Sequence, residues 1–305
     1  MVKALVTGGA GFIGSHLVDA LVKEHQVTVI DNLSSGKEEY VSDEADLIIG
    51  DLTDLASIKS YFDSADVVFH IAANPDVSLG SKDTRVHIDQ NILATHNVLE
   101  AMRLNDVRDI VFTSSSTIYG LAPIPTPEDY GPLVPRSIYG ASKLACEALI
   151  SSYCHSFGMR SWIYRFANII GTRSNHGIIP DFIAKLRSNE EELVILGNGK
   201  QTKSYCHISD CIDAMLYAYS NSDEDVNIFN IGSDDTISAV EIAYLVGRDM
   251  GLNPSYTFTG GDIGWVGDIP KMLLSIAKIR ELGWGPRYNS REAVNRTIKD
   301  ILADT

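Results

Sequence analysis

The stretch Thr7-Gly8-Gly9-Ala10-Gly11-Phe12-Ile13-Gly14 decides the fold of this 305-residue chain. It stands between an apolar run, Ala4–Thr7, and an apolar helical segment, so its glycines occupy a strand-to-helix turn. Glycine permits such a tight turn and lets the backbone approach a pyrophosphate, whose charge the free amides and the helix dipole stabilise. We therefore predict a dinucleotide site at Gly8, Gly11, Phe12, Ile13 and Gly14; the alternative is a turn without a ligand.

Short apolar runs alternate with helical segments through the first half of the chain. Such alternation predicts a parallel sheet whose crossovers are helices. The expected strands are Ala4–Thr7, Val27–Asp31, Leu47–Ile49, Val67–Ile71 and Ile110–Thr113. The expected helices are Phe12–Glu24, Leu55–Phe62, Asn91–Arg103 and Tyr139–Phe157. The fold class is therefore α/β, with a doubly wound parallel sheet of the Rossmann type.

The character of the chain changes twice beyond this sheet. A proline-rich loop from Pro123 to Pro135 is placed to border a ligand cleft. Further strands, and helices expected at Ser238–Met250 and Ser275–Leu282, indicate a smaller mixed α/β C-terminal lobe. We predict an NAD-binding domain over residues 1–167 and a substrate-binding lobe over 168–305, with the segment 203–235 returning to the first domain.

Composition and charge exclude several classes of protein. Hydrophobic residues make up 45% of the chain and charged residues 21%, as in ordinary globular proteins. The formal net charge of −15 repels phosphate, which argues against nucleic acid and anionic membranes as partners. The chain shows no charged leader and no apolar run of about 18 residues, the usual minimum for a membrane-spanning helix. We expect a cytoplasmic protein.

The cysteines show neither CxxC pairing nor an alternation with histidine at zinc spacing. A disulfide scaffold and a structural zinc site are therefore not expected. We predict buried free thiols at Cys146, Cys154, Cys206 and Cys211, and no metal site.

An acidic residue favours NAD over NADP. Asp31 ends the second expected strand, where a carboxylate accepts hydrogen bonds from the adenosine ribose and repels a 2′-phosphate. Lys37 follows closely enough to attract a phosphate, so NADP stays the alternative. Asp51 and Leu52 follow the third strand and could reach the adenine, although an Asp there is equally a helix N-cap. Small residues, Ala72 and Ala73, follow the fourth strand and leave room for a flat ligand or for helix packing.

A serine, a tyrosine and a lysine form the candidate catalytic set. Tyr139 and Lys143 are four positions apart, so on a helix they share one face. A cation beside a phenol lowers the phenol's pKa, which would make Tyr139 a general base. Ser114–Ser116 follow the fifth strand, where one hydroxyl can orient a substrate hydroxyl. Taken alone, the Tyr and Lys pair would indicate only an amphipathic helix.

These segments together resemble the extended short-chain dehydrogenase/reductases, specifically the UDP-glucose 4-epimerase group, over nearly the whole chain. The resemblance is carried by Thr7–Gly14, Asp31–Gly36, His70–Ala73, Ser114–Gly120, Tyr139–Lys143 and Arg165–Asn168. It implies a bound NAD and a reaction in which Tyr139 takes the proton of the sugar 4-hydroxyl while hydride passes to NAD. Rotation of the 4-keto sugar and return of the hydride to its other face would interconvert UDP-glucose and UDP-galactose.

The resemblance also implies roles for individual residues. Counting back from Tyr119-Gly120 places the catalytic hydroxyl on Ser115. The implied cofactor contacts are Asn32, Ser34, Ser35, Gly36, Asn91 and Phe166, together with Tyr139 and Lys143. The implied contacts to the UDP-sugar are Asn168, Lys203, Tyr205 and Met272; for Lys203 a solvated loop lysine is the alternative.

Three positions bear on how the diphosphate and the sugar would be held. Trp265 stands three residues before Asp268, where the family more often has an arginine on the pyrophosphate. Arg173 is the candidate to compensate, unless it is an ordinary surface arginine. Met272 matches a position that lines the sugar pocket, and its flexibility would admit N-acetylated sugars unless it only fills the core.

Other activities share the first chemical step. The related dehydratases carry an Asp and a Glu directly after the catalytic hydroxyl, whereas this chain has Ser116 and Thr117, which are weak acids and bases near neutral pH. Another nucleotide-sugar epimerase, a UDP-glucuronate decarboxylase and a non-catalytic NAD sensor stay open. The helices expected at Asn91–Arg103 and Tyr139–Phe157 resemble those through which family members pair, so we expect a homodimer.

Overall fold

Seven parallel strands form the central layer of the molecule. The computed structural model describes residues 1–262, 264 and 269–304. The strand order is β11-β6-β5-β4-β1-β2-β3, and every neighbouring pair is parallel. The bounds are β1 Lys3–Thr7, β2 Gln26–Asp31, β3 Asp46–Ile49, β4 Val67–His70, β5 Asp109–Ser115, β6 Arg160–Phe166 and β11 Val226–Ile231. The order reverses between β1 and β4, the place where doubly wound sheets bind their ligands.

Helices cover both faces of this sheet because successive residues of a strand point to opposite sides. Leu5 of β1 packs against α2, α3 and α4, whereas Ala4 and Val6 pack against α1 and α6. Strands buried on both faces read as the continuous apolar runs seen in the sequence. The bounds of these helices are α1 Phe12–Leu21, α2 Leu55–Ile58, α3 Ala94–Leu104, α4 Ile138–Phe157 and α6 Ile208–Asn221.

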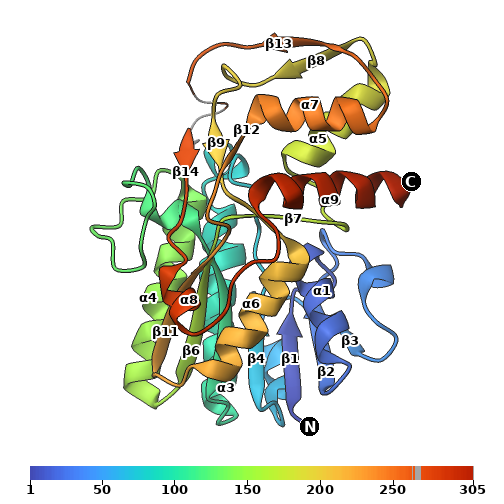
Figure 1. The fold of residues 1–305 in the computed structure, drawn as a ribbon. Coiled ribbons are helices and arrows are strands. Elements are labelled where there is room, and N and C mark those ends of the chain that lie inside the picture. Colours follow the sequence, from blue (N-terminus) through green and yellow to red (C-terminus); the bar gives the residue numbers. More distant parts are fainter. Residues whose placement is uncertain (263, 265–268, 305) are drawn as a thin grey trace.

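A smaller lobe lies at the carboxyl ends of the large sheet's strands (Figure 1). Its core joins α5, α7 and α9 to the parallel pair β8 and β13. Short strands connect the lobe to the sheet: β10 pairs with β7, and β9 lies between β12 and β14. The bounds are α5 Ile178–Ser188, α7 Ala239–Asp249, α8 Ala277–Glu281, α9 Ser290–Ala303, β7 Asn168–Ile170, β8 Glu192–Ile195, β9 Thr202–Lys203, β10 Tyr205–His207, β12 Ile237–Ser238, β13 Ser255–Phe258 and β14 Lys271–Met272.

The predicted fold class, a doubly wound Rossmann sheet, is confirmed, and the elements differ from the prediction mainly at their ends. The predicted helix Leu55–Phe62 is α2 followed by a 3₁₀ turn, Lys59–Phe62. The predicted helix Asn91–Arg103 begins earlier, as a π-helical turn at Ile88–Leu93 that continues into α3. The segment 203–235 contains α6 and β11, and β11 pairs with β6 at the edge of the large sheet. Further 3₁₀ turns lie at Glu38–Tyr40, Leu79–Ser81 and Ser116–Tyr119.

The four cysteines are buried free thiols, as predicted. Among the residues that the structure describes, none of the helices is both long and apolar enough to span a bilayer.

Candidate cofactor and active site

The glycine loop brings three backbone segments into contact. Gly8 ends β1 with φ +72°, and a Cβ there would lie 2.7 Å from the backbone nitrogen of Ala72. A Cβ on Gly14 would lie 2.1 Å from the carbonyl oxygen of Gly8. Gly11 is the N-cap of α1 and has no side chain to cap the first helical amides. These amides, at the positive end of the helix dipole, suit the pyrophosphate predicted from the sequence.

Asp31 holds the next loop against the glycine loop. Its carboxylate accepts hydrogen bonds from the amides of Ala10, at 3.0 Å, and Leu33, at 2.8 Å. Each carboxylate oxygen keeps a further acceptor site, which a ribose hydroxyl can use. Gly36 is required nearby, because a Cβ there would lie 2.8 Å from the carbonyl oxygen of Ala10. The ammonium of Lys37 pairs with the carboxylate of Glu39 at 3.1 Å on the surface. The charge of Lys37 therefore has a partner within the chain other than a 2′-phosphate.

The polar residues that follow Asp31 lie at the same carboxyl edge of the large sheet. The side chain of Asn32 accepts a hydrogen bond from the amide of Ser34, at 3.0 Å. Ser35 follows Ser34 in an exposed bend that leads to Gly36.

The two predicted adenine contacts, Asp51 and Leu52, follow the end of β3. Asp51 accepts hydrogen bonds from the amide and hydroxyl of Thr53, and these bonds lower the pKa of its carboxyl. The N-cap of α2 is Asp54, so the helix-cap alternative for Asp51 is wrong. Leu52 is buried, and its carbonyl accepts from Asn97 at 2.8 Å.

Small residues follow β4, as the sequence suggested. The amide of Ala72 donates to the carbonyl of Thr7 at 3.0 Å, which closes the end of β4 onto β1. Ala73 follows in a half-buried position. Asn91 is buried behind them and donates to the hydroxyl of Ser142 on α4, at 3.0 Å. Asn91 therefore links this strand end to the helix that carries Tyr139 and Lys143.

The candidate catalytic residues meet where β5 faces α4. The hydroxyl of Ser115 accepts hydrogen bonds from the amide and hydroxyl of Thr117, at 3.2 and 3.0 Å. Its own proton is therefore free to donate, and the hydroxyl lies close enough to Tyr139 to favour the phenolate. The ammonium of Lys143 donates to the carbonyl of Thr113 at 2.7 Å and lies 4.7 Å from the centre of the Phe112 ring. The three predicted residues thus lie together.

Burial sets the protonation states of this set. It lowers the pKa of Lys143 to about 8, so the ammonium is still the main form at pH 7. It raises the pKa of Tyr139 to about 12, and the hydrogen bond from Ser115 opposes that rise. The predicted lowering of the Tyr139 pKa by Lys143 is therefore wrong for the chain's own groups, because burial favours the neutral phenol. A positive ligand beside the phenol would have to provide that lowering.

The predicted substrate residues lie together where the lobe joins the sheet. Met272 of β14 is the register partner of Lys203 in β9, and Tyr205 in β10 is the register partner of Asn168 in β7. The side-chain amide of Asn168 donates to the carbonyl of Ser204, at 3.0 Å. Phe166 is buried at the end of β6, two residues before Asn168. The large sheet and the lobe therefore meet at these residues.

Arg173, the candidate to compensate for the missing arginine, pairs with a carboxylate of the large domain. Its guanidinium lies 2.8 Å from Asp19 on α1 and 5.6 Å from the centre of the Tyr40 ring. Compensation by Arg173 stays a prediction, with an ordinary surface arginine as the alternative. Trp265 and Asp268, on which that prediction also depended, lie outside the described residues.

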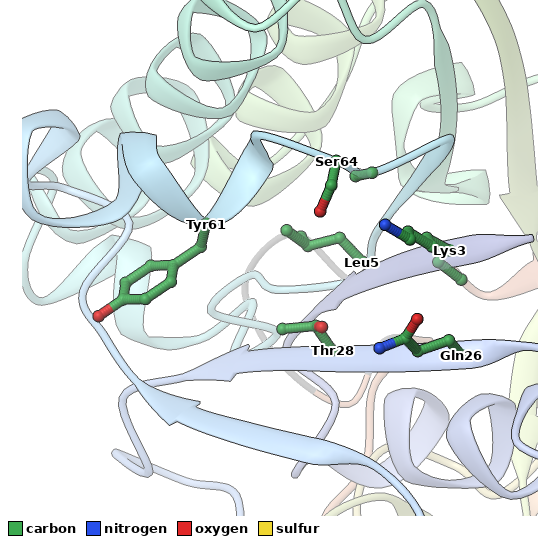
Figure 2. A pocket seen from close by; sticks show the side chains of 8 residues that line it. Lys3, Leu5, Gln26, Thr28, Tyr61 and Ser64 are labelled. Atoms are coloured by element: carbon green, nitrogen blue, oxygen red, sulfur yellow. The ribbon is translucent and has the colours of Figure 1, made fainter.

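A small hollow at the opposite edge of the sheet is unrelated to this site. It lies at the amino ends of β1 and β2 and measures about 60 Å³ (Figure 2). This volume corresponds to about two water molecules. It is lined by Lys3, Ala4, Leu5, Gln26, Thr28, Tyr61, Ser64 and Ala65.

Sequence reasoning missed a group of buried polar residues behind the catalytic set. Glu147 and Arg165 form an ion pair at 2.8 Å with both side chains almost fully buried. The hydroxyl of Ser114 donates to Glu147 at 2.5 Å. The signal was present in the sequence, because Glu147 follows Lys143 by four positions and so continues the helix face of Tyr139 and Lys143.

The fold and this arrangement define a Rossmann-type protein with a Ser-Tyr-Lys set beside its dinucleotide loop. The model of the NAD dependent epimerase/dehydratase family matches residues 4–232. The chain belongs to this family, and its cofactor is NAD.

The chain is also similar to individual members with several activities. It is 30% identical to the UDP-glucose 4-epimerase of Corynebacterium glutamicum, over 99% of this chain and 95% of the relative. It is 35% identical to the UDP-N-acetyl-alpha-D-glucosaminuronate decarboxylase of Bacillus cytotoxicus, over 79% of this chain and 78% of the relative. A crystal structure of a UDP-galactose 4-epimerase superposes with a TM-score of 0.91 at 42% identity and covers 99% of both chains.

Substitution of Gly14 by alanine tests the glycine loop. The new Cβ would collide with the carbonyl of Gly8, so we expect Gly14→Ala to lose most of its bound NAD. NAD released by denaturing the purified protein gives the measure. The control is Gly131→Ala, because a Cβ at Gly131 meets no atom within 4 Å. A Gly14→Ala protein that retains stoichiometric NAD would contradict the proposed geometry.

Proposed function

We propose that this chain is a UDP-sugar 4-epimerase that interconverts UDP-glucose and UDP-galactose. One observation carries this proposal: the buried ammonium of Lys143 on α4 binds the carbonyl of Thr113 on β5, which brings Tyr139 of the same helix beside Ser115 at the end of that strand. The similarity to UDP-glucose and UDP-galactose 4-epimerases over nearly the whole chain supports it.

The residues of the set would divide the proton transfer between them. NAD, when bound, accepts the hydride from the sugar carbon and returns it. Tyr139 takes the proton of the 4-hydroxyl and gives it back, and Ser115 holds that hydroxyl in place. Lys143 fixes α4 against β5 through the carbonyl of Thr113, and the positive nicotinamide ring of bound NAD would favour the phenolate. Return of both the hydride and the proton leaves the sugar with no net oxidation, and return of the hydride to the opposite face of the 4-keto carbon would invert it.

The lobe would hold the nucleotide and the sugar. We propose residues 1–167 as the NAD-binding domain and residues 168–305 as the substrate-binding lobe, with 203–235 belonging to the first. Asn168, Lys203 and Tyr205 would bind the UDP moiety, and Met272, next to Lys203 in the small sheet, would line the sugar pocket. A flexible methionine at that position favours acceptance of N-acetylated sugars as well.

A decarboxylase of a UDP-sugar acid is the second candidate, because a relative with that activity is 35% identical over 79% of this chain. Both activities begin with oxidation at the same carbon. Elimination is less well supported, since Thr117 uses its hydroxyl as a donor to Ser115 and supplies no carboxylate.

Proton NMR of the purified protein with NAD and UDP-galactose tests the function directly. We expect UDP-glucose to appear without accumulation of NADH, and UDP-N-acetylglucosamine to be converted in a parallel sample. Tyr139→Phe should abolish conversion in both, because it removes the base and keeps the ring. Loss of carbon dioxide from UDP-glucuronate, with no change in UDP-galactose, would instead establish the decarboxylase.

We also propose that two copies pair through α3 and α4. Exposed apolar side chains lie on these helices, among them Leu93, Leu104 and Phe157, which are 39%, 49% and 52% exposed. Arg103 of α3 lies 5.5 Å from the centre of the Phe157 ring of α4, so the two helices offer one continuous surface. Such a patch gains free energy when a second copy covers it.

Light scattering measures this association. We expect the mass of a dimer for the wild type and of a monomer for Phe157→Glu, because a carboxylate in place of the apolar ring would have to lose its water when the second copy covers it. The control is Phe258→Glu, which alters an exposed phenylalanine of the lobe. A monomeric wild type would refute the pairing.

A further inference from the structure

Three consecutive residues of β5 face three residues of α4. The carbonyl of Thr113 binds Lys143, and Ser115 lies beside Tyr139. Ser114, between them, donates its hydroxyl to Glu147 at 2.5 Å. Residues 139, 143 and 147 lie on one face of α4, so Glu147 fixes the next turn of the same helix against the same strand.

Arg165 holds Glu147 from the neighbouring strand. It is the register partner of Ser114 in the pair of β5 with β6, and its Nη2 donates to Glu147 at 2.8 Å. A second contact, from Nε, measures 3.1 Å. Ser114 and Arg165 are 3% and 4% exposed, and Glu147 is 5% exposed. Two charges removed from water in this way add little to stability as a rule, which suggests that the pair serves another purpose.

The other end of Arg165 reaches the proline-rich loop. Its Nη1 donates to the hydroxyl of Tyr119 at 2.9 Å and to the carbonyl of Glu128 at 2.8 Å. Tyr119 in turn donates to the side chain of Asn230 in β11, at 2.8 Å. The amide of Asn230 donates to the carboxylate of Glu128, and its side chain donates to the carbonyl of Ser275, three residues after the end of β14. One network therefore joins α4, β6, the loop and the segment after Met272.

Among the described groups whose charge shifts the pKa of Lys143, Glu147 is the carboxylate. The groups around that ammonium include His70, whose pKa burial lowers to about 3, and His87, whose pKa burial also lowers. Burial raises the pKa of the Cys146 thiol, so all three are neutral near pH 7. Glu147 raises the pKa of Lys143 and so opposes the effect of burial.

We propose that Glu147 and Arg165 are positioning residues of the active site: they fix Ser115 and the ammonium of Lys143 relative to Tyr139 and connect this set to the loop at 121–136. The role in turnover rests on the proposed epimerase function. The role in placing Lys143 rests on the bonds of Glu147 to Ser114 and Arg165 and on its position one turn after Lys143 on α4.

Glu147→Gln tests both roles. The amide has the shape of the carboxylate but lacks its charge, so we expect kcat to fall by about tenfold or more with KM little changed. Lys143 should also titrate at a lower pH than in the wild type, because the charge that favours its ammonium is gone. The titration is followed by NMR of protein labelled with ¹³C at the lysine ε-carbon, with the signal of Lys143 identified by its absence from Lys143→Arg. The high-pH limb of kcat should move downward with it.

The matched control is Asp109→Asn. Asp109 pairs with Arg160 at 2.7 Å across the same two strands, at their opposite ends, so its loss should leave kcat and the titration of Lys143 unchanged. The double variant Glu147→Leu/Arg165→Met removes both buried charges together and is expected to fold. Like Glu147→Gln, it should lose kcat and lower the pKa of Lys143.

Each result decides between the roles. Wild-type kcat and an unmoved Lys143 titration in the double variant would overturn the proposal and leave the pair as a packing element. If the wild type converts no UDP-sugar, the proposed function fails, whereas a shifted titration in Glu147→Gln still supports the positioning of Lys143.

Discussion

Close backbone contact at Gly8 and Gly14 is the constraint on which the rest of the structure depends. No side chain fits between the end of β1, the start of α1 and the residue after β4, because a Cβ on Gly14 would lie 2.1 Å from the carbonyl of Gly8. This contact brings the amides at the start of α1 to the carboxyl edge of the sheet. A parallel sheet collects the ends of β1, β2, β4 and β5 at that edge, so the cofactor loop and the Ser-Tyr-Lys set become neighbours.

The charged groups buried at this edge have hydrogen-bond partners within the protein. Lys143 uses the carbonyl of Thr113, and Glu147 uses Ser114 and Arg165. An unmatched charge in such surroundings would cost several kcal/mol. The phenol of Tyr139 is not activated by Lys143 through space alone, because burial favours the neutral phenol. Activation is left to a ligand with positive charge.

Very short strands bring together the residues that we propose for substrate binding. Lys203 and Met272 become neighbours only because β9 pairs with β14, although they are far apart in the sequence. In contrast, Arg173 is close in sequence to Asn168 but turns to Asp19 of α1. The proposed substrate site therefore depends on non-local contacts, and two-residue strands are too short to be predicted from a sequence.

The sequence by itself determined the fold class, the glycine loop, the acidic strand end at Asp31 and the pairing of Tyr139 with Lys143 on one helix face. These features are local: a turn, a strand end and a helical spacing each depend on a few successive residues. Only the tertiary structure decided that Asp54 rather than Asp51 caps α2, that Arg173 pairs with Asp19, and that burial raises the pKa of Tyr139. It also revealed the pair of Glu147 with Arg165. Protonation states and ion pairs depend on which distant residues exclude water, and that is settled only when the strands and helices pack.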